Sequence, residues 1–440
     1  MKMRVMLTGD MAQRQKKNSS ARPDLRLFRG IGALYTLEGA ARKQGRHGKP
    51  EDLGLIEKAA LLVRGERVVW SGSEKELRSN SELKAMLKAS RVQDENFKGA
   101  TVIPAFTECH THLIHAGNRA GEFERRNQGE SYQSIGKSGG GILATVLPTR
   151  AASVPQLAKI AQERLERYIR QGVTTVEVKS GYALTVDGEM KMLKAAGLLK
   201  KARIVRTFLG AHAIPKEFSS ADTYIQELID KALPRLKKEG SACRVDIFIE
   251  DGYFSRDLAR KYLVAARANG FDVVIHADQL TRSGGASLAV ELGARSADHL
   301  IRINQDDIAK LSASEVTCVL LPNSDLYMNC AYPPARALIE KGARVALATD
   351  FNPGSAPSQD LALTGVLARV QMKMSLAEVM ISYTVGAAHA LGLGQELGSL
   401  VQGKLCDFSV LQGSFDELFL SVGQMPIKSV YKSANCIFTL

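Results

Sequence analysis

The residues best suited to chemistry in this sequence are histidines that follow short apolar runs. Six of its eight histidines stand at or just past the ends of such runs: His110, His112, His115, His212, His276 and His299. His110-Thr111-His112 places two imidazoles at positions i and i+2, which a strand points to the same side. His276 and Asp350 each end another apolar run. Because three imidazoles and one carboxylate suit zinc or another divalent first-row metal, we predict a metal site at His110, His112, His276 and Asp350.

Asp350 can serve such a site in two ways, as a ligand and as a base. A bound divalent ion lowers the pKa of a coordinated water to about 7, and a nearby carboxylate can then accept the proton. A second metal ion usually needs a bridging carboxylate or carbamylated lysine on the fourth strand, where this sequence has Glu250; Lys179 ends only the second. We therefore expect one metal ion, with His212 and His299 as orienting or proton-transferring groups.

The elements that must position these residues follow an alternating pattern. Helical stretches (156–171, 189–201, 221–239 and 255–269) separate short apolar runs, as in a parallel sheet with crossover helices. We count eight runs: Thr101–His112, Thr174–Lys179, Arg206–His212, Arg244–Glu250, Asp272–His276, Ser296–His299, Val316–Pro322 and Arg344–Asp350. Eight parallel strands close a (β/α)₈ barrel, whose active sites lie at the carboxyl ends of the strands. The pattern thus predicts an α/β fold with the histidines gathered at one mouth.

Both ends of the chain predict a second, smaller unit. Leu25–Leu37, Ala59–Ser71, Lys404–Leu411 and Ile427–Leu440 are strand-like, Gly65-Glu66 is typical of a hairpin turn, and Glu38–Gly54 reads as a loop. Residues 1–24 are polar and without periodicity, which favours a disordered tail. We expect three parts: this tail, a composite β-sandwich of residues 25–100 and 400–440, and the barrel of residues 101–399.

Composition narrows the possible partners and location. The formal net charge of +13 invites a nucleic-acid-binding interpretation, but eight Lys and Arg against two Asp in Met1–Gly30 supply much of it. No strip of aromatic and basic residues suited to nucleic acid is present, and the apolar runs are too short to span a bilayer. Six cysteines without CxxC spacing and no secretory apolar stretch favour the cytoplasm. We expect a soluble protein that binds neither nucleic acid nor membrane.

Several longer motifs resemble a known family. Residues 104–112 (PAFTECHTH) resemble the opening of the amidohydrolase superfamily and residues 398–410 (GSLVQGKLCDFSV) its closing landmark. Within that superfamily, the imidazolonepropionase family is the closest resemblance, and it covers nearly everything after the tail. It rests on residues 116–146, EVKSGYAL (177–184), TFLGAHAIP (207–215), HADQL (276–280), SADHL (296–300) and ATDFNPGSAP (348–357).

The resemblance implies a function and a set of site residues. It implies hydrolysis of 4-imidazolone-5-propanoate to N-formimidoyl-L-glutamate in histidine degradation, with one zinc or iron ion. Asp350, His299 and His276 would be the catalytic residues, and a homodimer is usual for such enzymes. Substrate contacts would fall on Arg119, Tyr132, Tyr182, His212, Gln279, Asn352, Gly354 and Ser355. An arginine fork suits the propionate carboxylate of such a substrate.

Other interpretations of these residues remain open. Arg119 could form a surface ion pair with Glu122 or Glu124, and the two tyrosines could be rim or core aromatics. The sequence departs from the family pattern at Ala105, Glu108, Ala183 and Ser355, and Gln279 stands where some members carry Glu. A deaminase of a cyclic amidine or nucleobase would share the metal residues but would not need Arg119 and Tyr132. A non-catalytic nucleic-acid-binding barrel is the alternative from a different class.

Overall fold

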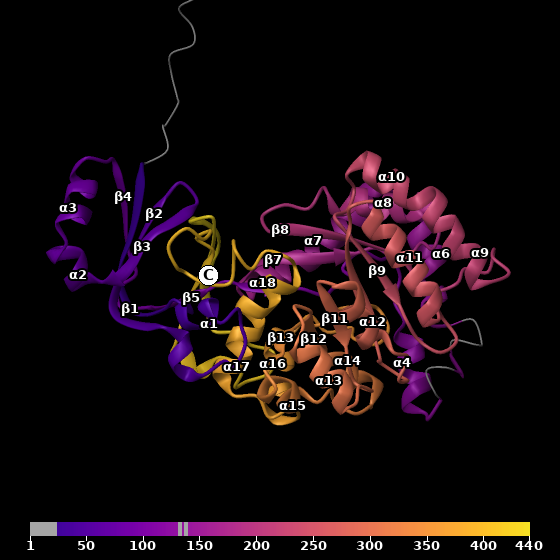
Figure 1. Cartoon of the computed structure of the whole chain (residues 1–440). Helices are drawn as coiled ribbons and strands as arrows, with labels where there is room; N and C mark the ends of the chain where they lie inside the picture. The colour runs from indigo at the N-terminus through magenta and orange to yellow at the C-terminus, as the bar shows by residue number, and fades with distance from the viewer. Residues whose placement is uncertain (1–23, 131–133, 136–139) are drawn as a thin grey trace, which may run out of the picture.

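The protein, described here by a computed structural model covering residues 24–130, 134–135 and 140–440, is organised around two sheets of eight strands each. The predicted tail lies outside the described residues, apart from Asp24. Strands β1–β4 lie at one end of the molecule and helices α8–α11 at the other (Figure 1). None of the helices among the described residues is both long and apolar enough to cross a bilayer.

One sheet is parallel, and its strands follow one another in chain order. They are β6 (Phe106–Glu108), β7 (Val173–Lys179), β8 (Arg203–Ala211), β9 (Arg244–Phe248), β10 (Asp272–Ala277), β11 (Ser296–His299), β12 (Thr317–Leu320) and β13 (Arg344–Leu347). Each overlaps one of the eight predicted runs. The first and last strands meet just beyond their ends, where the backbone N–H of His112 donates to the carbonyl oxygen of Phe351 at 2.9 Å. The predicted (β/α)₈ barrel is confirmed.

The helices cover the outside of this sheet (Figure 1). In α7 (Val154–Arg170), Ser153 caps the N-terminus by accepting the backbone N–H of Gln156, and Leu157, Ala161 and Leu165 form its buried face. The others are α4 (Ala120–Asn127), α6 (Leu143–Ala151), α8 (Val186–Ala196), α9 (Ala221–Glu227), α10 (Leu233–Glu239), α11 (Arg256–Ala268), α12 (Gly285–Leu292), α13 (Gln305–Ser312), α14 (Pro322–Met328), α15 (Ala335–Glu340), α16 (Leu361–Val370), α17 (Leu376–Ile381) and α18 (Ala387–Ala390).

The barrel strands divide their residues between two environments. On β7, Val176 and Val178 belong to the large apolar core, whereas Glu177 and Lys179 are equally buried but contact each other inside the barrel. This alternation follows from the two-residue period of a strand. It places a layer of charged side chains inside the barrel, below the mouth.

The other sheet, called the smaller sheet below because it belongs to the smaller of the two predicted folded units, joins both ends of the chain, as predicted. Its strands are β1 (Leu25–Tyr35), β2 (Leu55–Arg64), β3 (Arg67–Ser73), β4 (Val92–Asn96), β5 (Thr101–Pro104), β14 (Phe408–Leu411), β15 (Ile427–Lys432) and β16 (Asn435–Thr439). A bulge in β1 between Phe28 and Ile31 lets the strand pair first with β4 and then with β5. One face packs in an aromatic cluster in which Phe408 lies 5.1 Å from Phe28 and 4.4 Å from Tyr431 between ring centroids. The other face packs on α2 (Glu74–Ser79) and α3 (Ser81–Lys88).

Two local expectations were wrong. The run 101–112 is not one strand, because β5 pairs with β1 and β14 in the smaller sheet while β6 opens the barrel. The segment 38–54 is not all loop, because it contains α1 (Glu38–Arg42) and a 3₁₀ turn (Pro50–Leu53). Asp52 stabilises that turn by accepting the backbone N–H of Lys49 at 2.9 Å and the ammonium of Lys43 at 2.7 Å.

Candidate active site

The barrel mouth brings together the four residues predicted to bind metal. His110 and His112 follow β6, His276 lies near the end of β10, and Asp350 follows β13; all are at most 3% exposed. Asp350 Oδ1 lies 3.3 Å from His110 Nε2 and 3.4 Å from His112 Nε2. The ring centroids of His110 and His276 are 4.6 Å apart. Strands far apart in the sequence thus contribute to one cluster.

The unpaired atoms in this cluster fit a cation. His110 Nδ1 lies 2.6 Å from Asp298 Oδ2, so the proton of this imidazole sits on Nδ1 and Nε2 carries a lone pair. That lone pair faces the carboxylate of Asp350, and two acceptors 3.3 Å apart repel each other. His110 Nε2, His276 Nε2 and Asp350 Oδ1 are buried without a hydrogen bond to any described residue. A divalent ion between them would satisfy all three atoms.

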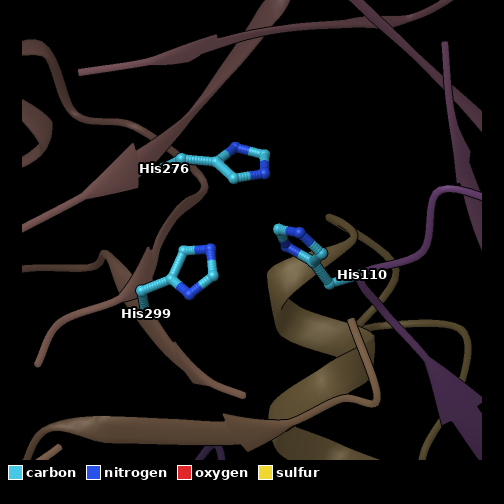
Figure 2. A group of neighbouring side chains, drawn as sticks. All are labelled: His110, His276 and His299. Carbon is cyan, nitrogen blue, oxygen red and sulfur yellow. The ribbon is translucent and has the colours of Figure 1, made fainter. Parts of the chain in front are cut away.

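His299 lies as close to the cluster as the predicted ligands do. Figure 2 shows the imidazoles of His110, His276 and His299 turned toward a shared space. One nitrogen from each lies within 4.8 Å of the other two, and the same holds for ligand atoms of His110, His112 and Asp350. His299 Nδ1 is buried without a hydrogen-bond partner in the described residues. The geometry therefore allows His299 to face either the metal or a molecule bound beside it.

Two of these residues adopt backbone conformations that strands do not use. Asp350 has φ +52° and His299 has φ +78°, in the left-handed region that L-residues rarely enter. Such conformations cost about 1–3 kcal/mol and are concentrated at functional sites. They turn the chain sharply where β11 and β13 end, and so direct both side chains to the mouth.

Burial keeps three of these imidazoles neutral, whereas at His276 the effect of burial is outweighed by Asp246, which raises the pKa above its ordinary value. Burial is the largest cause that lowers the pKa values of His110, His112 and His299 well below the ordinary value. Burial raises the pKa of Asp350, but His110 and His299 outweigh it and hold that pKa below its ordinary value. Neutral imidazoles and an ionised carboxylate are the protonation states that bind a divalent metal.

A layer of charged residues below the mouth supports the histidines. Asp298 accepts from His110, and Asp246 Oδ1 lies 3.1 Å from His276 Nδ1. Lys179, which is fully buried, lies 2.8 Å from Asp246 and 3.0 Å from Glu177. Burial lowers the pKa of Lys179, but Asp246, Glu177 and Asp298 together raise it above its ordinary value.

The formal charges of this region favour a divalent cation. Two cations, Lys179 and Arg244, lie among four carboxylates, which are Glu177, Asp246, Asp298 and Asp350. Carboxyl groups therefore outnumber cations around the histidines. Because uncompensated charge is costly to bury, this layer fits a metal-loaded site.

Glu250, the residue considered for bridging a second metal, has another role. Its carboxylate accepts the backbone N–H groups of Leu280 at 2.8 Å and Thr281 at 3.1 Å. The contact pins the loop after β10 rather than reaching the histidines. Lys179 is held among the three carboxylates of the layer below. Both side chains thus have other partners and do not reach the space between the histidines.

A narrow pocket of about 30 Å³ opens among the metal residues. Six predicted substrate residues line it: Arg119, Tyr182, His212, Gln279, Asn352 and Ser355. Tyr132 lies outside the described residues. The lining also includes Ile142, Phe248, Leu280 and Met328, which the sequence did not single out because apolar side chains resemble core residues.

Arg119 is buried at the wall of this pocket. Its exposed fraction is 5%, and its guanidinium lies 2.7 Å from the carboxylate of Glu122. Arg119 therefore forms the ion pair that the sequence allowed and also lines the pocket. Gly354 packs against Arg119, and a Cβ there would displace the guanidinium. The backbone carbonyl of Gly354 is held by Arg126 Nη2 at 3.0 Å. Arg119 therefore has a fixed place next to the mouth.

The other predicted substrate residues have defined partners. His212 Nδ1 donates to the carbonyl oxygen of Gly181 at 3.0 Å, which leaves Nε2 as an acceptor. Asn352 Oδ1 accepts the N–H groups of Gly354 and Ser355 at 2.9 and 2.7 Å, so this residue shapes its own loop. Gln279 lies 3.4 Å from the hydroxyl of Ser324.

Comparison with known proteins places this geometry in a family. Residues 101–435 match the sequence pattern of the amidohydrolase family. The chain is 52% identical over 412 residues to an imidazolonepropionase from Bdellovibrio bacteriovorus, covering 94% of this chain and 96% of that protein. It is 40% identical to an imidazolonepropionase from Symbiobacterium thermophilum, covering 89% of this chain and 91% of that protein. An adenosine deaminase from Xanthomonas campestris with bound zinc shares the fold, with a TM-score of 0.68 and 16% identity over 94% of this chain and 93% of the other. The chain belongs to the amidohydrolase family and, within it, to the imidazolonepropionases.

Proposed function

We propose that the barrel mouth hydrolyses 4-imidazolone-5-propanoate to N-formimidoyl-L-glutamate, with one zinc or iron ion held by His110, His112, His276 and Asp350. Family membership makes the chain a hydrolase of carbon–nitrogen bonds in cyclic amides. The observation that carries the residue assignments is the convergence of buried, unpaired ligand atoms beside a buried arginine. Nitrogen and oxygen ligands suit both zinc and iron.

In this proposal a bound metal ion would activate the attacking water, and Asp350 would transfer the protons. A divalent ion, when bound, lowers the pKa of a coordinated water to about 7. Asp350 accepts the water proton as oxygen adds to the ring carbonyl carbon, and it returns a proton to the ring nitrogen as the carbon–nitrogen bond breaks. His299, whose Nδ1 has no partner among the described residues, faces the reacting carbonyl and orients it.

The pocket wall supplies recognition of the substrate. Arg119 binds the propionate carboxylate, since its guanidinium can donate two parallel hydrogen bonds. Tyr182, which lines the same pocket as Arg119, adds a hydroxyl donor, and Tyr132, outside the described residues, is the second tyrosine that the family resemblance assigns to the substrate. His212 and Gln279 hold the ring, while Asn352, Gly354 and Ser355 form the loop that closes against Arg119.

The activity test follows the absorbance of the substrate, generated in situ from urocanate by urocanase. Purified protein should accelerate its decay far above the spontaneous rate. A chelator should abolish the acceleration, and zinc or iron should restore it. A well-folded, metal-loaded protein with no acceleration would refute the proposal.

Two rival functions give different results in parallel assays. A deaminase would release ammonia from a cyclic amidine or nucleobase and would be indifferent to loss of Arg119. A nucleic-acid-binding barrel would bind oligonucleotides in a salt-sensitive way and would be indifferent to metal removal. We expect neither result, and we propose an anionic small molecule as the only ligand class of this mouth besides the metal.

We further propose that the protein works as a homodimer in the cytoplasm. The absence of a membrane-spanning helix among the described residues and six cysteines without a disulfide there agree with this location. Sedimentation analysis of the purified protein would show twice the chain mass. A single chain mass at working concentrations would refute the dimer.

A further inference from the structure

Lys179 occupies a central place beneath the proposed metal site. It ends β7 with no exposed surface, and its ammonium lies 2.8 Å from Asp246 and 3.7 Å from Asp298. These carboxylates come from β9 and β11, two strands that are not neighbours in the barrel. One ammonium therefore lies near two carboxylates that approach the site from different sides.

Each of those carboxylates contacts a different predicted ligand. Asp246 uses Oδ2 for Lys179 and Oδ1 for His276, while Asp298 Oδ2 approaches His110 Nδ1 at 2.6 Å. A carboxylate that accepts from Nδ1 fixes the ring orientation and leaves Nε2 to bind a metal. The orientation of both rings thus depends on how firmly the two carboxylates are held.

The backbone around Lys179 strengthens this link. Its N–H donates to the carbonyl oxygen of Thr111 at 3.0 Å, and Thr111 is the residue between His110 and His112. The hydroxyl of Thr111 donates in turn to the carbonyl oxygen of Glu177 at 2.6 Å. The end of β7 is therefore linked indirectly to three of the four proposed ligands, to His276 and His110 through carboxylates and to the segment that carries His112 through Thr111.

We propose that Lys179 is a positioning residue for the metal, holding Asp246 and Asp298 so that His276 and His110 present Nε2 together. The inference rests on the proposed metal site and extends it to a residue that does not touch the ion. The proposed role of Lys179 does not depend on which substrate the site binds. It predicts that loss of the Lys179 ammonium lowers the metal affinity of a protein that still folds.

Metal affinity, measured without substrate, tests this proposal. Lys179→Met removes the ammonium and keeps an unbranched side chain. Competition between apoprotein and a chelator should show zinc affinity about 10–100-fold weaker than in the wild type, as is typical for residues behind metal ligands. The cobalt(II) absorption bands should also shift, because ligand geometry changes. Lys404→Met is the matched control, since Lys404 is another buried lysine but donates only to the carbonyl oxygens of Gly394 and Leu397.

A double variant separates positioning from simple charge balance. Lys179→Met with Glu177→Gln removes one cation and one carboxylate, and Glu177 has no hydrogen bond to a ligand histidine among the described contacts. We expect this variant to fold and still bind zinc weakly, with the shifted cobalt spectrum. Recovery of wild-type affinity and spectrum would overturn the proposal, because charge balance alone would then suffice.

Three other outcomes would count against the role of Lys179 or against the metal site itself. Failure of both Lys179 variants to fold would overturn the proposal by making Lys179 a folding residue. Wild-type affinity and spectrum in Lys179→Met would overturn it while leaving the metal site intact. Failure of the wild type to bind zinc or cobalt would instead remove the proposed metal site itself, so the two failures are distinguishable.

Discussion

The two sheets of this molecule cover cores of opposite character, one apolar and one charged. The smaller sheet encloses an aromatic cluster of Phe28, Phe97, Phe408 and Tyr431. The barrel encloses ion pairs, with fully buried Lys179 between Glu177 and Asp246. Apolar packing stabilises without needing specific partners, whereas buried charges are costly unless every one is compensated. The comparison indicates that the smaller sheet serves stability and that the barrel interior is organised for the site above it.

Substitution at the mouth should have the largest effect. Asp350→Asn removes the group that accepts the water proton, and kcat should fall on the order of a thousandfold while the fold is retained. Steady-state kinetics with the metal content measured on the same sample checks this. Asp360→Asn is the control, because Asp360 caps α16 and asparagine also caps helices. A metal-loaded Asp350→Asn protein with wild-type kcat would contradict the assigned role.

Substitution in the aromatic cluster should affect stability and not the chemistry. Phe408 is fully buried, so Phe408→Ala should lower the free energy of unfolding by about 3–5 kcal/mol. The kcat/KM per folded molecule should stay unchanged at low temperature. Denaturant titration and kinetics on the same preparation measure both. A large loss of kcat/KM in folded protein would show that the two regions are not separate in their roles.

Substitution at the pocket wall should affect recognition of the substrate. Arg119→Ala should lower kcat/KM about a hundredfold, mainly through KM, because a charged hydrogen-bonding pair with the propionate is lost. Arg125→Ala on the same helix, α4, removes a partly exposed ion pair with Glu130 and should have little effect. Unchanged KM in Arg119→Ala would favour a substrate without a carboxylate.

The smallest expected effect concerns a histidine away from the mouth. Burial, followed by Arg344 and Lys404, lowers the pKa of His389 to about 4. Between pH 6.5 and 4 the unfolded chain binds a proton there that the folded chain does not, so the free energy of unfolding falls as the pH falls. Because His389 is partly exposed, it should change the free energy of unfolding by at most about 2 kcal/mol across this pH range. Denaturant titrations across this pH window should give a shallower slope for His389→Gln, and equal slopes would contradict the assignment.

Much of the barrel could be predicted because its strands are apolar and evenly separated by helices. The proposed ligands were visible because His110, His112, His276 and Asp350 end such strands. The layer behind them was only partly visible, since Lys179 ends a predicted run, whereas Asp246 and Asp298 lie inside runs where no periodicity marks a charged partner. Their contacts join strands that are distant in the sequence, and only the folded barrel brings them together.

Backbone geometry explains the other differences. Between its first residue and its histidines, the run 101–112 holds only one short break, Pro104 where β5 ends, and two polar residues, Thr107 and Glu108, so its pattern reads as one strand instead of β5 and β6. The left-handed conformations of His299 and Asp350 were equally invisible, because such conformations are usually signalled by glycine.

The most direct test of a single-metal hydrolase at this mouth is to titrate metal into the apoprotein while measuring the initial rate of imidazolonepropionate loss. Zinc, and iron under anaerobic conditions, would be tested separately. We predict that the rate rises linearly and stops rising at one equivalent per chain. A break at two equivalents, or full activity without metal, would contradict this organisation of the site.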